Sequence, residues 1–519
     1  MKNVHSFRMK LQRFRKKGLS LTLFFMDKGG DATGLDARMP KSLTSMLKKR
    51  WSEQGGFRDV LRLALPLILS TGSWSIQQFM DRMFLTWYSA DAIAAASPAG
   101  IFNFTVMSLF IGTASYVGTF VAQYYGANMP HRIGPAIWQG IYVAIIGGLF
   151  VMGLIPLAWP IFNAIGHDMA VREQEVIYFQ YLCIGSMPLI AAAAMSSFFS
   201  GIGKTVIIMW VNLAMTAINI ILDYGMIFGR LGMPQMGIKG AAIATSIAAF
   251  FNFFAYLVII VRPWYNHTFH TIRGWRFEKE LFWRLVRFGV PSGVQFFLDM
   301  SGFTAFLMIM GRLGTVNLAA TNIAFNINTI AFMPMLGFGI AISVLVGQYL
   351  GKNRPDLAQK STYSGFIMTF VYMATISFLY VAVPGLFIEP FAARSDPWVF
   401  SGIWNLTVVL LRFVAVYSLF DTLSIVFSSA LKGAGDTRFI MYMIVGVSVF
   451  VLVIPSYIGI IVLGGGLYMG WTFASLYVIF LGLGFLLRFL KGKWKSMRVI
   501  EVHPPAICAE RRECPAVEL

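Results

Sequence analysis

Long apolar runs recur along this sequence from about residue 61 to residue 490, and each holds 18 residues or more. A helix of that length crosses a hydrocarbon core of roughly 30 Å. In lipid every backbone polar group must find its partner within the protein, so the runs are predicted to be helices rather than strands. Apolar residues make up 57% of the 519 residues and charged residues only 13%. These values indicate an all-α membrane protein with no segment left for a catalytic domain, so we do not expect an enzyme.

An internal repeat divides the runs into two halves. Residues 62–126 match residues 287–351 at a constant separation of 225 positions, and further on the separation is 232. The corresponding positions include Pro66 and Pro291, Asn103 and Asn328, Gly112 and Gly337, Gln123 and Gln348, and Gly201 and Gly433. Six spans per half follow, about twelve in all. Because six is even, the halves are expected to be parallel repeats about an axis along the membrane normal, with a central cavity between them.

The repeat and the charged loops predict the organisation of the chain. The expected spans are 60–88, 95–124, 134–158, 175–200, 205–228, 238–261, 281–311, 316–350, 361–385, 401–431, 438–463 and 467–490. Residues 57–261 would form an N-terminal six-helix lobe and residues 281–490 a C-terminal one, joined by a cytoplasmic linker at 262–280. A basic cytoplasmic extension is predicted at 1–56 and a cytoplasmic tail at 491–519.

The net charge of +19 suggests a nucleic-acid partner until its distribution is considered. Residues 1–56 carry thirteen Lys and Arg against four Asp and Glu, and the connection after the sixth span is also basic. The alternate connections, near 163–175 and 389–398, are poor in Lys and Arg. This bias predicts that both termini lie in the cytoplasm, with the chain integral to the cytoplasmic membrane. The lipid bilayer is therefore the expected partner of the basic segments, and nucleic acid is not.

Four aspartates fall inside predicted spans: Asp81, Asp223, Asp299 and Asp421. A charge at the bilayer centre costs about 2.5–3.5 kcal/mol on insertion scales, so such residues are candidates for function. An amide or phenol side chain precedes each acid by four residues, which places both on one helical face. These partners are Gln77, Asn219, Gln295 and Tyr417.

Two interpretations of the acids stay open. In the first, they are structural carboxylates with satisfied partners: Asp81 pairs with its neighbour Arg82, and Asp223 lies near a helix end. In the second, they bind a coupling ion. A buried carboxylate can take a proton, and an ionised one can hold sodium beside amide, hydroxyl and carbonyl oxygens. Either ion would suffice, because one charge crossing 100 mV releases about 2.3 kcal/mol. The sequence contains no G-x-x-x-x-G-K-[ST] phosphate loop, so an ion gradient is the expected energy source and no other cofactor is expected.

The membrane part resembles the multidrug and toxic compound extrusion (MATE) transporters over roughly residues 57–490. The likeness rests on motifs in a fixed order: Pro66 with Asp81, Asn219-x3-Asp223 followed by Gly237-x2-Gly240 and Thr245, Pro291 with Asp299, and Tyr417-x3-Asp421 followed by residues 431–437, LKGAGDT. The resemblance implies a V-shaped pair of six-helix lobes. It also implies exchange of sodium ions or protons for cationic drugs, dyes or metabolites.

The same resemblance implies two ion-coupling sites. One, in the N-terminal lobe, matches Asp81, Asn219, Asp223 and Thr245, with Gln77 as possible support. The second, in the C-terminal lobe, matches Asp299, Tyr417 and Asp421, with Gln295 as possible support. Sodium would bind at these same residues. Relatives with the second set usually carry Glu at or beside the position of Asp299.

The sequence therefore predicts a monomeric antiporter that exports small organic molecules, most readily cationic and drug-like ones. The nearest alternative is a flippase for lipid-linked precursors. A flippase needs basic residues in its spans to hold phosphates, whereas the spans here offer acids, with Arg82 and Arg412 as the main exceptions. A scaffold or receptor would have no use for several buried acids.

Overall fold

The computed structural model describes residues 50–392 and 397–501. The predicted N-terminal extension and C-terminal tail therefore lie mostly outside the described residues. The first half contains α4 (Phe57–Tyr88), α5 (Ala90–Ser115), α6 (Val117–Gly126), α7 (Ile133–Met152), α8 (Ala158–Ile165), α9 (Met169–Gly201), α10 (Thr205–Phe228), α11 (Ile238–Ile260) and α12 (Pro263–Phe269). The second contains α13 (Lys279–Gly311), α14 (Thr315–Gly351), α15 (Pro355–Ala382), α16 (Gly385–Ala392), α17 (Pro397–Ala434), α18 (Thr437–Val447), α19 (Ile454–Tyr457) and α20 (Leu467–Leu490).

Eleven helical stretches of the described chain are long and apolar enough to cross a membrane. The helix α4 adds the remaining span: it has 32 residues, and polar residues such as Gln77, Asp81 and Arg82 lower its hydropathy. The all-α fold of twelve spans predicted from the sequence is confirmed. Two prolines that correspond in the repeat, Pro66 and Pro291, lie inside α4 and α13, as is tolerated in membrane-spanning helices.

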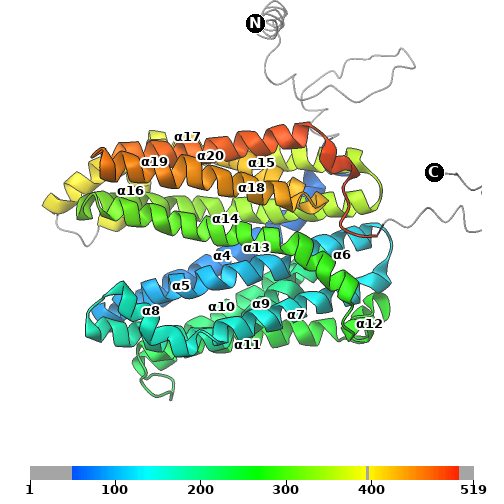
Figure 1. The fold of residues 1–519 in the computed structure, drawn as a ribbon, viewed down its shortest axis with the longest axis horizontal. Helices are drawn as coiled ribbons and strands as arrows, with labels where there is room; N and C mark the ends of the chain where they lie inside the picture. The colour runs from blue at the N-terminus through cyan, green and yellow to red at the C-terminus, as the bar shows by residue number, and fades with distance from the viewer. Residues whose placement is uncertain (1–49, 393–396, 502–519) are drawn as a thin grey trace, which may run out of the picture. The chain divides into compact units, whose positions relative to one another are not determined.

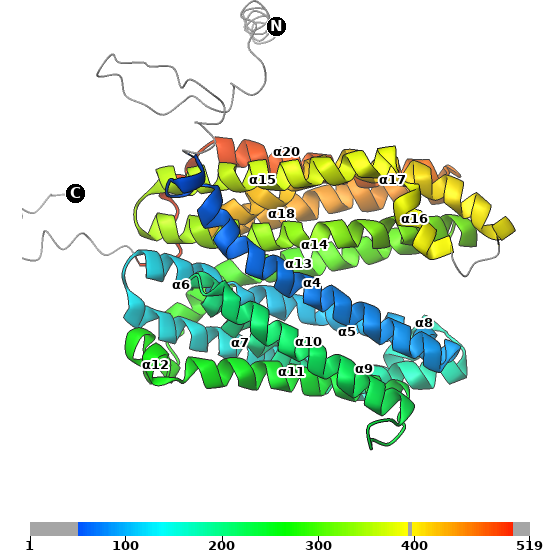
Figure 2. The same ribbon diagram turned by 180° about the vertical axis from the view of Figure 1, so that it is seen from behind.

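The helices of residues 50–501 gather into two groups (Figures 1 and 2). The N-terminal group comprises α4 to α11, with α9 packed against α5, α7 and α11. The C-terminal group comprises α13 to α20, with α17 packed against α14, α15 and α20. The two groups meet where α5 packs on α13 and α14 packs on α4 and α6, and they diverge toward the end that holds α8 and α16 (Figure 2).

The contact between the groups follows the repeat. A Cβ atom on Gly112 of α5 would lie 2.8 Å from the Cα of Gly293 in α13, so only glycine allows this approach. A Cβ atom on Gly337 of α14 would lie 2.9 Å from the backbone nitrogen of Ile68 in α4. Gly337 and Gly293 stand 225 positions after Gly112 and Ile68. The two crossings are therefore repeat-related versions of one contact.

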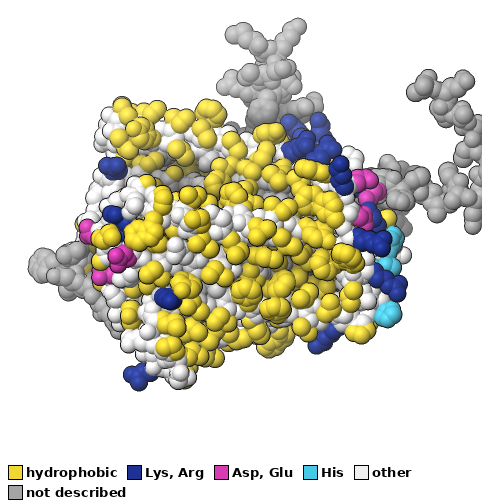
Figure 3. All heavy atoms as spheres, turned by 60° about the horizontal axis from the view of Figure 1, so that its bottom comes forward, with side chains coloured by type: hydrophobic (Ala, Val, Ile, Leu, Met, Phe, Trp, Pro, Cys, Tyr) yellow, Lys and Arg dark blue, Asp and Glu magenta, His cyan; other side chains and the backbone are white. Residues whose placement is uncertain are grey.

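Charged residues gather at one end of the bundle, which we call the basic end. It contains the connections after α6, α11 and α14 and the segment after α20, with residues such as Arg132, Arg273, Lys352 and Lys493. A broad apolar surface separates it from the opposite end in Figure 3. This pattern is the one expected of helices that cross a bilayer.

The helices depart from the predicted spans in three places. The second span breaks at Tyr116, whose hydroxyl donates to the Lys432 carbonyl oxygen at 3.0 Å, while its repeat partner α14 is continuous. The third span ends at Met152 and continues as the short α8. The eleventh contains π-helical turns at Ser448–Val453 and Ile458–Val462 on either side of Pro455, because proline withholds a backbone donor.

Candidate ion-coupling sites

Asp81 and Asp223 form the centre of a polar site in the N-terminal group. They belong to neighbouring helices, α4 and α10, and are 8% and 0% exposed. Their carboxyl groups are in hydrogen-bonding contact with each other. Two ionised carboxylates repel at that distance, so a shared proton or a bound cation is needed to hold them together. The packing of α4 against α10 therefore brings two carboxyl groups together in one site.

Asn219 completes the pair from α10. With its amide nitrogen turned toward the acids, it donates to Asp81 Oδ1 at 3.0 Å and to Asp223 Oδ2 at 3.3 Å. The same nitrogen lies 3.2 Å from the side-chain nitrogen of Gln77. The spacing of four residues between Asn219 and Asp223 thus brings the amide and acid together as expected from the sequence. Three of the predicted site residues converge at this point.

One buried oxygen of the site, Asp223 Oδ1, has no hydrogen-bond partner among the described residues. An unpaired buried oxygen is costly unless a proton or cation satisfies it. Carboxylate and amide oxygens are ligands suited to a hard cation such as sodium. The donor set therefore fits either candidate coupling ion.

Thr245 is the fourth predicted residue of this site. It lies on α11, which packs on α10, and its hydroxyl makes no hydrogen bond in the part of the chain that the structure describes. Tyr178 of α9 also lies near both Asp81 and Asp223. Sequence reasoning missed Tyr178, because an isolated tyrosine in an apolar span gives no positional signal.

Arg82 is not an ion-pair partner of Asp81. Its side chain is exposed, whereas Asp81 is buried and turned to α10. Among the described residues, none of the four intramembrane aspartates forms an ion pair with a basic side chain. The charge of Arg82 therefore acts on Asp81 at a distance, without the hydrogen-bonded ion pair that the structural reading expects.

The second candidate site lies in the C-terminal group. Asp299 of α13 hydrogen-bonds Gln295 one turn earlier, the contact that their spacing predicts. Asp421 of α17 lies near enough for its charge to interact with that of Asp299. Tyr477 of α20 lies near both acids, as Tyr178 does in the first half.

Tyr417 faces a polar patch on α14. Its hydroxyl accepts a hydrogen bond from Asn328 Nδ2 at 3.2 Å, and Ser418 donates to Asn328 Oδ1 at 3.4 Å. The same phenol lies within electrostatic reach of Asp421 one turn later. The structure thus places Tyr417 between Asp421 and an amide of the neighbouring helix.

Lys432 of α17 is a basic neighbour that sequence reasoning missed. Its ammonium group interacts electrostatically with Asp299, although the two do not form an ion pair within the described chain. Hydropathy ends the tenth span at residue 431, whereas α17 continues to Ala434 and carries the half-buried Lys432 in its last turn. Lys432 stands in the LKGAGDT segment, so the motif pointed to the position but not to its electrostatic role.

Comparisons with known proteins agree with this architecture. The MatE family model matches residues 66–225 and 291–458, one block in each half. A probable multidrug resistance protein NorM from Thermotoga maritima is 25% identical over 450 residues, covering 85% of this chain and 94% of that protein. The multidrug resistance protein NorM from Burkholderia vietnamiensis is 27% identical over 385 residues, covering 73% of this chain and 82% of that protein.

Solved structures share the fold. The outward-facing conformation of a multidrug resistance MATE family transporter superposes with a TM-score of 0.77 at 15% identity and covers 89% of this chain and all of that one. The eukaryotic MATE transporter AtDTX14 superposes with a TM-score of 0.74 at 17% identity and covers 85% of this chain and 96% of that one. Because the family model matches both halves of the sequence, over more than half of its length, this chain belongs to the MatE family of multidrug and toxic compound extrusion transporters.

Proposed function

We propose that the chain is a secondary active antiporter that exports small organic molecules, cationic and drug-like, in exchange for sodium ions or protons. The observation that carries this proposal is the buried contact between Asp81 and Asp223, with Asn219 donating to both. Two buried acids without an ion-pair partner are costly, and a travelling cation offsets that cost.

The coupling ion need not touch the substrate. Taking up a proton or sodium changes the charge of a buried site by one unit and so favours one packing of α4 against α10. Ion and substrate are exchanged when each favours a different arrangement of the two helix groups. The energy is sufficient, because about 2.3 kcal/mol is released per charge and 100 mV.

The relatives support an organic substrate, because the NorM proteins are named for multidrug resistance. Aromatic rings at the contact between the groups support a flat cationic one. Phe104 of α5 meets Phe296 of α13 edge to face at 5.8 Å between ring centroids, and Trp74 lies 5.5 Å from Phe104. Aromatic faces attract organic cations through the ring quadrupole.

We place the basic end in the cytoplasm of a cell whose cytoplasmic membrane holds the protein. Lys and Arg are enriched in short cytoplasmic loops of membrane proteins, and the connections of the basic end are of that kind. Export then runs from the basic end to the end that holds α8 and α16. The flippase alternative finds less support, because the acids outnumber the one basic side chain, Lys432, that interacts with the C-terminal site.

A dye-efflux assay in intact cells tests this proposal. Asp81→Asn, Asp299→Asn and Asp421→Asn are each expected to lower efflux at least about tenfold at matched expression, since each removes a carboxylate that the ion would need. Asp91→Asn is the matched control, because Asp91 is exposed at the start of α5. Unchanged efflux in all three variants would rule out coupling through these acids.

A further inference from the structure

The chain does not leave the bundle after its last span. Beyond α20 it forms a short 3₁₀ helix at Lys493–Ser496 and then an extended segment, residues 497–501, which we call the strap. Trp494 is 1% exposed and stacks on Phe489, and Val499 is 2% exposed. A segment that buries these side chains is part of the folded body.

The strap lies where the two helix groups meet at the basic end. The backbone N–H of Val499 donates to Gln123 Oε1 of α6 at 2.9 Å. Gln123 in turn donates through Nε2 to the carbonyl oxygen of Gly433 in α17 at 3.0 Å. The amide of one strap residue is therefore bonded to a side chain that already bridges the N-terminal and C-terminal groups.

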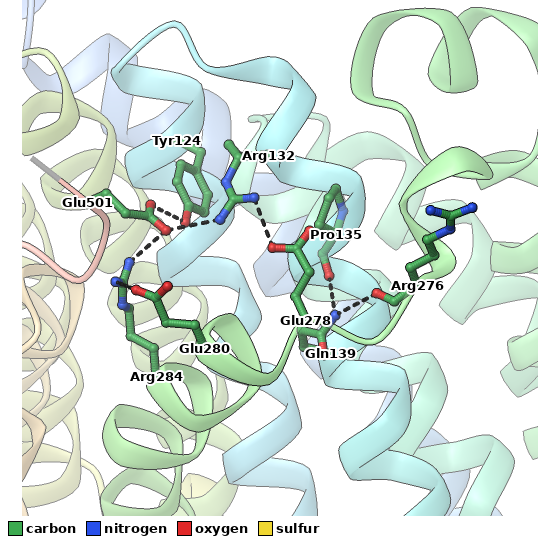
Figure 4. A network of polar contacts seen from close by, with 9 residues as sticks. All are labelled: Tyr124, Arg132, Pro135, Gln139, Arg276, Glu278, Glu280, Arg284 and Glu501. Carbon is green, nitrogen blue, oxygen red and sulfur yellow. Dashed lines mark hydrogen bonds and ion pairs between the residues drawn. The ribbon is translucent and has the colours of Figure 1, made fainter. Parts of the chain in front are cut away.

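Glu501 makes a second bridge, shown in Figure 4. Its carboxylate accepts from Tyr124 at 2.7 Å and from Arg132 Nη2 at 3.0 Å, both in the N-terminal group. The same carboxylate pairs with Arg284 Nη1 of α13 at 2.7 Å. One negative group thus bridges two arginines from opposite helix groups, each of which also pairs with a second glutamate: Arg132 with Glu278 at 2.9 Å and Arg284 with Glu280 at 2.7 Å.

The repeat shows that the strap is an addition to a symmetric contact. Gln348, the counterpart of Gln123, donates to the carbonyl oxygen of Gly201 at 2.8 Å, and Gly201 is the counterpart of Gly433. Both glutamines thus close the same contact from opposite sides. The side chain of Gln123 also accepts the backbone N–H of Val499, whereas no backbone amide of the described residues donates to the side chain of Gln348. The strap therefore reinforces only one of the two repeat-related bonds.

We propose that the strap is a latch: it stabilises the closed arrangement of the basic end and must detach before the two groups separate there. The proposal goes beyond the transport function and rests on the alternation of the groups that the proposed antiport requires. Removing a bond of Glu501 is then expected to raise the population in which the basic end is open.

The opening can be measured as the alkylation rate of a cysteine buried in the contact. Thr119 is 6% exposed and shares a face of α6 with Gln123 and Gly126, the face that packs on α14. In full-length Thr119→Cys protein in nanodiscs, with Cys508 and Cys514 changed to serine, a water-soluble maleimide reacts only on opening. Its rate follows the open population. The native Cys183 is buried, and protein without Thr119→Cys gives the background.

Glu501→Gln is expected to raise this rate about tenfold, because a charged bridge to two arginines is lost. Tyr124→Phe is expected to raise it about threefold, because one hydrogen bond to the carboxylate is lost. Glu280→Gln is the matched control: Glu280 pairs with the same Arg284, but its side chain is 85% exposed and does not touch the strap.

Rates for Glu501→Gln and Tyr124→Phe within twofold of the Glu280→Gln control would overturn the latch. Each variant is first shown to elute as folded protein. If Glu501→Gln fails that test, Tyr124→Phe decides alone, since it retains the buried ring. The measurement needs neither substrate nor ion gradient, so a negative result leaves the proposed antiport standing, and a failure of antiport does not change the alkylation rates.

Discussion

Asp81 illustrates how burial, rather than proximity in sequence, selects the partner of an acid. Its chain neighbour Arg82 is exposed, and the carboxyl turns instead to Asp223 and Asn219 on α10. A guanidinium keeps its hydration at the surface, whereas two buried acids gain from a shared proton or cation.

Substitutions at the two neighbours separate the ion-coupling and structural readings of Asp81. We expect Asp81→Asn to lower dye efflux at least about tenfold and Arg82→Gln to change it less than about twofold. Efflux in everted vesicles at equal protein content measures both. Equal losses in the two variants would mean that Arg82 and Asp81 act as an ion pair after all.

Glu501 is a second residue whose environment fixes its charge. Burial alone would raise its pKa, but hydrogen bonds from Tyr124 and Arg132 and the charge of Arg284 lower the pKa to about 2. The folded-state value lies below the ordinary one, so the stabilisation is present above the ordinary pKa of about 4.3 and is lost as the pH falls through about 2. Glu501 therefore stays ionised between pH 6 and pH 8.

The pH dependence of thermal unfolding tests that assignment. The Tm difference between the wild type and Glu501→Gln is expected to stay constant between pH 8 and pH 6 and to shrink only below the ordinary pKa of a glutamate. A scanning-fluorimetry series from pH 8 down to below that ordinary pKa measures it. A difference that disappears between pH 8 and pH 6 would contradict a depressed pKa.

The sequence was sufficient for contacts within one helix and insufficient for contacts between helices. Asn219 with Asp223 and Gln295 with Asp299 meet because helical geometry alone brings residues four apart together. The neighbours Tyr178 and Lys432 come from tertiary packing, which one sequence does not encode in its spacing. Thr245 was placed by family resemblance and makes no hydrogen bond with the acids within the described residues.

At the scale of elements, the repeat relates the two crossings between the helix groups to each other. Residues 225 apart occupy matching positions in the α5–α13 and α14–α4 crossings, so the internal match predicted related helices before any coordinates. It did not predict the break at Tyr116, because that break depends on a bond to the Lys432 carbonyl oxygen in the other group. Nor did it predict the strap, whose partners lie more than 200 positions away in the chain.

Gly112 provides a test of the crossing. Gly112→Ala places a methyl group 2.8 Å from the Gly293 Cα and 2.9 Å from the Ser292 carbonyl oxygen, so α5 and α13 must move apart. Overpacking of this kind costs about 1–3 kcal/mol and should lower Tm by several degrees in a fluorescence melt.

Gly72→Ala is the matched control for that experiment. Gly72 also lies inside a helix, α4, but a Cβ atom there meets nothing within 4 Å. Alanine is favoured over glycine in a helix by about 1 kcal/mol, so this variant should be as stable as the wild type or more stable. A Gly112→Ala protein that melts at the wild-type temperature would show that the crossing is looser than described.

At the scale of the whole molecule, the distribution of charge sets the orientation. The alternation of basic and acidic connections was legible in the sequence, and the structure collects the basic ones at one end of the bundle. Orientation in the membrane is a prediction from the positive-inside bias.

Thiol labelling in intact cells tests the orientation. Lys352→Cys, at the exposed turn after α14, should react with an impermeant maleimide only after the cells are opened. Met169→Cys, at the exposed start of α9 on the opposite end, should react in intact cells. The reverse pattern would invert the direction of transport proposed for the chain.

Counter-transport in proteoliposomes tests the central claim most directly. With purified protein and a fluorescent organic cation, sodium and pH gradients are imposed separately, and Asp81→Asn is measured beside the wild type. The proposed antiport predicts that one of the two gradients drives substrate against its own gradient and that Asp81→Asn abolishes this drive while leaving the protein folded. Substrate accumulation that ignores both gradients, or that persists in Asp81→Asn, would contradict ion-coupled export through the buried acids.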